Sequence, residues 1–183
     1  MKHTLVALME DRPGVLTRVV SLFRRRNFNI ESISVGHTET PDISRMTLVV
    51  DGSNTVVEQV TKQLYKLINV RKVSDVTDDP TVDRELALIK VTAKPSTRSE
   101  ILQIVDVFRA KVIDVSPNAL IVEATGQEEK IDGLVAMLRG YGIKEMVRTG
   151  KVSMVRGMGA TRETSGAPAS NGNGVAKALN SES

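Results

Sequence analysis

The stretch from Glu10 to Ile33, EDRPGVLTRVVSLFRRRNFNIESI, holds the residues best suited to bind a small ligand. Its apolar spacing predicts a helix that begins near Gly14, without a hydroxyl or amide side chain at the usual capping position. A helix start with free backbone N–H groups carries a positive dipole end and attracts a carboxylate or phosphate. The alternative is structural: Asp11 caps the helix, Pro13 stiffens its first turn and Gly14 allows close packing.

The other predicted helix starts show a different pattern. Each has a Thr followed three residues later by a Glu, the capping box in which a hydroxyl and a carboxylate satisfy the first N–H groups. The pairs are Thr55/Glu58, Thr97/Glu100 and Thr125/Glu128. We therefore expect these starts to be closed by their own side chains and the first to be open.

The sequence offers no constellation for catalysis. His3 and His37 are the only imidazoles, and neither is near a nucleophile or a metal-ligand spacing. The absence of cysteine excludes disulfides, thiolate catalysis and Cys-ligated zinc. The acidic pairs fit a turn and a helix start, and no glycine-rich nucleotide loop is present. We expect a non-enzyme with no catalytic residue, no metal site and no cofactor of its own.

The basic cluster Arg24–Arg26 raises the question of nucleic-acid binding. Sheet-face RNA recognition needs aromatic stacking platforms, and only 3% of this chain is aromatic. Cations at a helix end complement its dipole, which explains the cluster without a phosphate partner. The formal net charge of +3, from 25 basic and 22 acidic residues, is mild. We expect no nucleic-acid partner.

Composition is typical of a soluble globular protein, with 40% apolar and 26% charged residues in a chain of 183. That length suffices for one or two small domains. No apolar run approaches the roughly 18 residues of a membrane span. Glu10 and Asp11 directly follow the first apolar segment, which fits neither a signal peptide nor a transit peptide. We expect a cytoplasmic protein with no membrane segment.

Apolar periodicity predicts the element order βαββαβ twice. In the first copy, the elements are a strand at 4–9, a helix from 15, a hairpin around 36–42, a helix at 56–68 and a strand at 70–76. In the second copy, they are a strand at 86–93, a helix at 99–110, a hairpin around 116–118, a helix at 128–140 and a strand at 143–147. This order predicts an α+β fold of two ferredoxin-like units, each an antiparallel sheet with two helices on one face. The uncovered faces carry apolar residues, so such units pair edge to edge or face to face.

The segments outside these units are polar. We expect residues 77–83 to form a short linker, and residues 158–183, rich in Gly, Ala, Ser and Asn, to be a disordered tail. The predicted domains are therefore residues 1–78, residues 79–157 and the tail.

Three strings carry a family resemblance: DRPGV at 11–15, NFNIESI at 27–33 and SRMT at 44–47. Residues 1–78 resemble the ACT domain, a module that binds small amino acids. Over about residues 2–157 the chain resembles the regulatory small subunit of acetohydroxyacid synthase (acetolactate synthase), in valine and isoleucine biosynthesis. The resemblance implies a homodimer whose ACT units share one sheet, with valine or another branched-chain amino acid bound at their interface.

The resemblance also implies an effector site. It comprises Asp11, Arg12, Pro13, Gly14 and Val15 of one protomer with Asn29 and Ile30 of its partner. Free amides would bind the effector's carboxylate, an Asp11 or Asn29 oxygen its ammonium, and Val15 and Ile30 its side chain. Arg12 departs from the family, where an uncharged residue is frequent, so the identity of the effector stays open. The second copy has no glycine at the matching residues 93–96, and we expect no effector there.

The implied function is activation and feedback inhibition of a catalytic large subunit. Thiamine diphosphate, magnesium and FAD would all be bound by that partner. The alternative function is a free-standing ACT-type amino-acid sensor that acts on another target.

Overall fold

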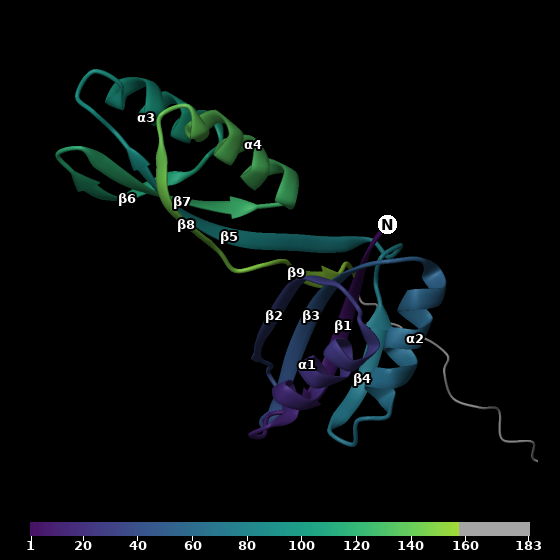
Figure 1. The fold of residues 1–183 in the computed structure, drawn as a ribbon. Helices are drawn as coiled ribbons and strands as arrows, with labels where there is room; N and C mark the ends of the chain where they lie inside the picture. Colours follow the sequence, from purple (N-terminus) through teal and green to yellow (C-terminus); the bar gives the residue numbers. More distant parts are fainter. Residues whose placement is uncertain (158–183) are drawn as a thin grey trace, which may run out of the picture.

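The computed structural model describes residues 1–157. The N-terminal unit forms a four-stranded antiparallel sheet in the order β2-β3-β1-β4, with α1 and α2 on one face (Figure 1). Its elements are β1 (Lys2–Glu10), α1 (Val15–Arg26), β2 (Ile30–His37), β3 (Ile43–Asp51), α2 (Asn54–Tyr65) and β4 (Val70–Asp75). The predicted βαββαβ order is confirmed for this unit.

The C-terminal unit repeats the same topology, with strand order β6-β7-β5-β8 and two helices on one face (Figure 1). Its elements are β5 (Thr81–Thr92), α3 (Arg98–Val107), β6 (Lys111–Ser116), β7 (Ala119–Gly126), α4 (Glu128–Arg139) and β8 (Ile143–Arg148). The α+β fold of two ferredoxin-like units is therefore confirmed. The predicted tail lies outside the described residues.

Each unit has its own apolar core between sheet and helices. In α1 the buried positions follow helical spacing, so one stripe faces the sheet; they are Val15, Val19, Leu22 and Phe23. The matching strand residues alternate along β1 and β3, as a half-buried sheet requires; they include Leu5, Ala7, Met46 and Leu48. A second, separate cluster fills the C-terminal unit. No helix within residues 1–157 is long and apolar enough to cross a bilayer.

A short strand that the sequence did not predict joins the two units. Strand β9 (Val152–Val155) pairs antiparallel with the first four residues of β5, Thr81 to Arg84. The expected linker at 77–83 is therefore wrong for residues 81–83, because backbone pairing with β9 draws them into a strand. We call the paired segments 81–84 and 152–155 the ribbon.

The ribbon lies against the outer face of the N-terminal sheet. The Arg45 guanidinium, from β3, donates a hydrogen bond to the Ser153 carbonyl across 2.7 Å. On the same face Val6 and Val49 are buried, with exposures of 2% and 4%. The expectation of a bare outer face is therefore wrong for this unit, since the chain folds its own C-terminal strand over it.

Candidate functional site

The turn from Asp11 to Gly14 connects β1 to α1. The Asp11 N–H donates to the Asp42 carbonyl at 2.8 Å, and the Val15 N–H donates to the Arg12 carbonyl at 3.3 Å. Gly14 is the N-cap of α1 and has a φ of 85°, a conformation that favours glycine. A Cβ at Gly14 would meet no atom within 4 Å. The turn is thus anchored at its base and faces open space at its tip.

The first amides of α1 are free in the described structure. The N–H groups of Gly14, Leu16 and Thr17 donate to no group within residues 1–157, and no side chain caps the helix. Unpaired N–H groups at a helix start, together with the positive dipole end, form a site for an anion. The geometry therefore retains the feature that the sequence indicated at this helix.

The predicted capping boxes are wrong. Helices α2, α3 and α4 have the N-caps Ser53, Thr97 and Gln127, and none of these makes a side-chain capping bond. The Thr97 hydroxyl donates back to the Lys94 carbonyl instead, and Thr125 lies within β7. Asp11 does not cap α1 either. What distinguishes α1 is the left-handed Gly14, because all four helix starts lack a side-chain cap.

The Asp11 side chain turns toward the end of β2. Its Oδ2 atom lies 3.0 Å from His37 Nδ1, so the turn and the end of this edge strand are adjacent. Beside it, Arg12 Nε lies 3.3 Å from Glu10 Oε2, which holds the Arg12 side chain near the preceding strand. Both charged residues of the predicted site therefore have partners in the free chain.

Glu10 fastens the base of the turn to β4. Its carboxylate accepts hydrogen bonds from Asn69 Nδ2 at 2.9 Å and Arg71 Nη2 at 3.0 Å. These bonds, from Asn69 first and then Arg71, lower the pKa of Glu10. The ionised Glu10 carboxylate therefore holds the end of β1, and the turn that follows it, beside Asn69 and Arg71.

Asn29 and Ile30, the other half of the predicted site, lie at the opposite end of α1. Asn29 is exposed and has no side-chain hydrogen bond within residues 1–157, whereas Ile30 opens β2 and packs partly on the core. The 12 residues of α1 separate Gly14 from Asn29 by about 18 Å. One chain alone therefore does not bring the two halves of the site together.

Val15 has a different place from the one expected. Its side chain is 4% exposed and belongs to the core of the N-terminal unit. The Val15 side chain is therefore not accessible to an effector at the turn. Within one chain, the accessible apolar side chain there is that of its neighbour Leu16.

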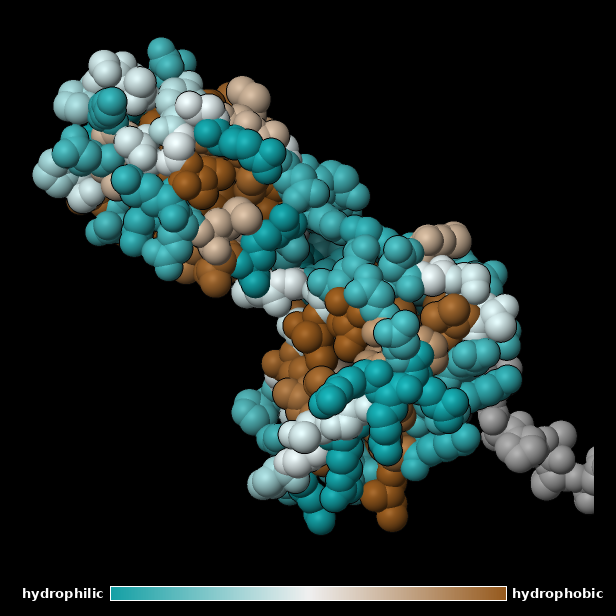
Figure 2. Space-filling view, viewed as in Figure 1, coloured by the Kyte–Doolittle hydropathy of each residue, from teal (hydrophilic) through white to brown (hydrophobic). Residues whose placement is uncertain are grey.

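Exposed apolar side chains gather along α1 and the edge strand β2. Figure 2 shows brown surface over this side of the N-terminal unit. We call Leu16 and Val20 of α1, with Ile33 and Val35 of β2, the edge patch; all four side chains are exposed. Strand β2 ends the sheet, so its outer backbone groups are also unpaired by any strand of the described chain.

The matching helix start in the second unit is surrounded differently. The Thr97 and Arg98 N–H groups both donate to the Lys94 carbonyl. The Arg98 guanidinium donates to the carbonyls of Ala93, Ser116 and Pro117 at 3.1, 2.8 and 2.7 Å. A charged side chain therefore bonds the backbone beside the turn that corresponds to the Gly14 turn, and the absence of an effector there stays a prediction.

Comparison with known proteins assigns the chain to a family. Residues 5–72 match the family described as the AHAS small subunit-like ACT domain, and residues 84–157 match the small subunit of acetolactate synthase. A probable acetolactate synthase small subunit from Archaeoglobus fulgidus is 56% identical over 157 residues, covering 86% of this chain and 98% of the relative. The chain belongs to the acetolactate synthase small-subunit family. The small subunit of Mycobacterium bovis is 55% identical over 155 residues, covering 85% and 92% of the two chains.

A solved structure supports the same assignment. The crystal structure of the acetolactate synthase small subunit from Thermotoga maritima superposes with a TM-score of 0.80 at 42% identity, covering 85% of this chain and 98% of that one. Members of this family are the regulatory component of the complex and not its catalytic subunit. Within residues 1–157, no three His, Asp or Glu side chains lie together as a metal site.

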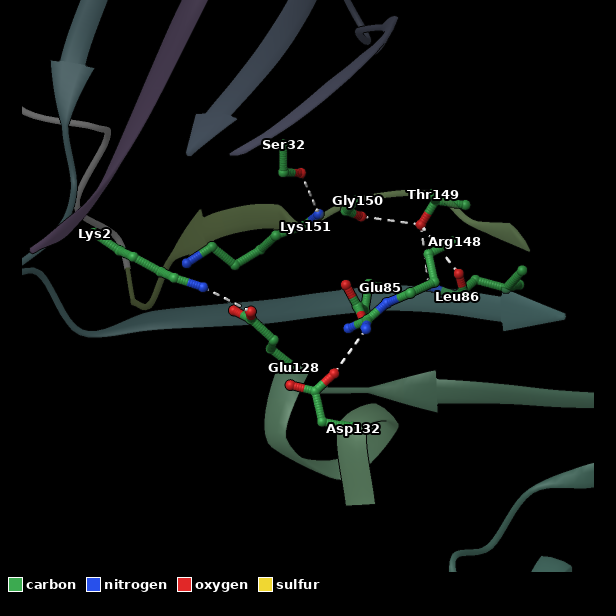
Figure 3. A network of polar contacts seen from close by, with 10 residues as sticks. All are labelled: Lys2, Ser32, Glu85, Leu86, Glu128, Asp132, Arg148, Thr149, Gly150 and Lys151. Carbon is green, nitrogen blue, oxygen red and sulfur yellow. Dashed lines mark hydrogen bonds and ion pairs between the residues drawn. The ribbon is translucent and has the colours of Figure 1, made fainter. Parts of the chain in front are cut away.

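The sequence did not predict a group of polar contacts between the two units, which we call the polar junction (Figure 3). Its two links join residues far apart in the chain: Lys2 with Glu128, and Ser32 with Lys151. Local patterns carry no signal for such contacts, since each residue is an ordinary polar surface residue in its own segment.

Proposed function

We propose that this small subunit activates a thiamine-dependent acetolactate synthase catalytic subunit and makes it sensitive to feedback inhibition by a branched-chain amino acid, valine first. The observation that carries the effector part is the left-handed Gly14 with the free amides of α1 behind it. Thiamine diphosphate, magnesium and FAD are expected on the catalytic partner, which performs the chemistry.

Homodimerisation through the ACT unit is the first step of this proposal. The edge patch and the unpaired outer side of β2 are adjacent, so one surface offers both apolar area and backbone hydrogen bonds. Two copies that pair their β2 strands antiparallel about a two-fold axis bury both and form one continuous sheet. Exposed Ile33 and Val35 on an edge strand favour this partner surface over solvent.

The same two-fold pairing completes the effector site. Strands β1 and β2 are both antiparallel to β3, so they run in the same direction, and β2 ends beside Asp11 at His37. Antiparallel pairing of two β2 strands places the start of one next to the end of the other. Asn29 and Ile30 of the partner subunit then lie near the Gly14 turn, although about 18 Å separates the two halves within one chain.

The resulting site matches an α-amino acid. The free amides of Gly14, Leu16 and Thr17 and the helix dipole suit the carboxylate. The Asn29 side-chain oxygen suits the ammonium because it has no partner in the described chain, whereas Asp11 is already paired with His37. Ile30 and the exposed apolar residues of the edge patch suit a small aliphatic side chain.

The test is acetolactate formation by the catalytic subunit of the same organism, measured alone, with this chain, and with this chain plus valine. The chain should raise the rate, and valine should then lower it. Equal rates in all three reactions would reject the regulatory role. Activation without sensitivity to any branched-chain amino acid would reject the effector assignment.

A further inference from the structure

The two units meet in the polar junction beside the start of β2 (Figure 3). Lys2 Nζ lies 2.9 Å from Glu31 Oε2 and 3.0 Å from Glu128 Oε1. Glu128 is the first residue of α4, so this ammonium links the first sheet to a helix of the second unit. The hydrogen bonds to Glu31 and then Glu128 raise the pKa of Lys2, because both carboxylates favour its charged form.

A close contact at Ser32 forms the second link. The Ser32 hydroxyl oxygen accepts a hydrogen bond from the Lys151 N–H at 3.2 Å. Gly150, with a φ of 79°, approaches so closely that a Cβ there would collide with Ser32 Oγ. Residues 149–151 connect β8 to β9, and an open cavity of about 440 Å³ lies between these residues, Glu31 and Arg148.

Both links start from the two residues that follow the proposed effector contacts. Asn29 and Ile30 belong to the effector site, and Glu31 and Ser32 are the next residues along the chain. We propose that the polar junction transmits effector binding from the start of β2 to the C-terminal unit. This inference rests on the proposed function. An effector that fixes Asn29 and Ile30 also fixes Glu31 and Ser32, and thereby favours the arrangement of the two units with the junction formed.

The energetics suit a movable junction. The Lys2 side chain is 52% exposed, and exposed ion pairs contribute little to stability. The backbone joins the units through β5, which continues from the ribbon into the second sheet, and through residues 149–151. A bend at these two connections that breaks the junction contacts gives a second arrangement of the two units, close in free energy to the first. A ligand selects between two such arrangements by its differential affinity for them.

Two substitutions test the junction and one serves as a control. Glu128→Gln removes the charge that Lys2 contacts and leaves Glu129 in the first turn of α4. Ser32→Ala removes the acceptor of the Lys151 N–H and tests the second link independently, including if Glu128→Gln does not fold. Glu145→Gln is the matched control, because it breaks the exposed Lys90–Glu145 pair (3.2 Å), which lies within the second unit.

The readout is the separation of the two units in the full-length dimer. The chain has no cysteine, so Lys62→Cys on α2 and Arg139→Cys on α4 introduce two sites for fluorescent dyes. Labelled chains are mixed with an excess of unlabelled chains, so that few dimers carry dyes on both protomers. Saturating valine should change energy transfer between the dyes. In Glu128→Gln and in Ser32→Ala this change, and the maximal inhibition of the catalytic complex, should each fall by at least about half. Loss of one link should weaken valine binding by about fivefold at most.

The outcomes separate the two proposals. If valine binds the unsubstituted chain without changing the energy transfer, or changes it as much in Glu128→Gln and Ser32→Ala as in the unsubstituted chain, the junction is not the relay and the proposed function stands. If Glu145→Gln behaves like Glu128→Gln, the effect is general charge removal and the relay is also rejected. If no branched-chain amino acid binds the unsubstituted dimer, the relay and the effector part of the proposed function both fail.

Discussion

Replacing Gly14 by Asp and by Asn tests whether an effector's carboxylate sits at the start of α1. Both side chains tolerate a φ of 85° better than other residues, and a Cβ there meets no atom within 4 Å. Each variant should therefore fold, with a similar loss of about 1–2 kcal/mol in the free energy of unfolding from the left-handed backbone. The two side chains have nearly the same shape and differ in charge and in the N–H donors that only Asn has, so weaker binding to the Asp variant reports an anion beside position 14.

The size of that difference follows from Coulomb's law. Two negative charges about 4 Å apart repel by about 1 kcal/mol at the dielectric of water and by about 4 kcal/mol at an effective dielectric of 20. The Gly14 turn is exposed in one chain and covered by the partner in the proposed dimer, so the value should lie between these limits. Gly14→Asp should therefore bind valine about 5- to 1000-fold more weakly than Gly14→Asn.

The assay is calorimetric titration of valine into each purified dimer, with thermal unfolding to confirm that both variants fold. Gly140→Asp is the control, because it adds the same charge in the second unit, at a glycine whose Cβ would also meet nothing within 4 Å. That variant should bind valine like the parent chain. Equal affinities for the Asp and Asn variants at position 14 would mean that no carboxylate binds at this helix start.

Three further predictions test the other parts of the site. Asn29→Ala removes a hydrogen bond to a charged group, worth about 1.5–3 kcal/mol, so calorimetry should show valine affinity reduced about 10- to 150-fold; unchanged affinity would place the ammonium elsewhere. Ile33→Lys puts a charge into the edge patch, so sedimentation should show monomers where the parent chain and Ile113→Lys, on the edge strand of the second unit, are dimers; a dimeric Ile33→Lys would reject pairing through β2. Because folding lowers the pKa of Glu10, its stabilising effect is present above its ordinary value of 4.5 and disappears as the pH falls. Glu10→Gln should accordingly be less stable than the parent chain at pH 7, and denaturant unfolding should show the gap narrowing below pH 4.5; a gap independent of pH would contradict this.

The fold was predictable because its determinants are local and periodic. A short apolar run marked β1, alternating apolar residues marked β3, and the helical spacing of Val15, Val19 and Leu22 marked the buried stripe of α1. Repetition of the same order after residue 80 then led to two units of one type. These signals depend on burial of one face, which the sequence encodes directly.

The capping boxes failed because capping depends on where the helix begins, within one or two residues. Helix α2 begins at Asn54, so Thr55 is already helical and its hydroxyl is past the capping position. Thr125 stays in β7 because the strand continues to Gly126. Sequence patterns place such boundaries less accurately than they place the elements themselves.

The ribbon and the polar junction could not be predicted from the sequence for another reason. Strand β9 has only four residues, and it forms because Thr81 to Arg84 lie beside it, about 70 residues away in sequence. Lys2 and Glu128 are 126 residues apart and carry no pattern that relates them. Such contacts depend on how the two finished units pack, which apolar periodicity does not encode.

The two repeats share one topology but differ at the start of their first helix. At the first helix start the backbone turns through a left-handed Gly14, whereas beside the second the Arg98 guanidinium bonds three backbone carbonyls. In the proposed effector site the first start needs a second chain, because Asn29 is a helix length away from Gly14 in its own chain. Effector affinity should therefore depend on dimerisation, and Ile33→Lys should lose valine binding without any change in the residues that contact valine.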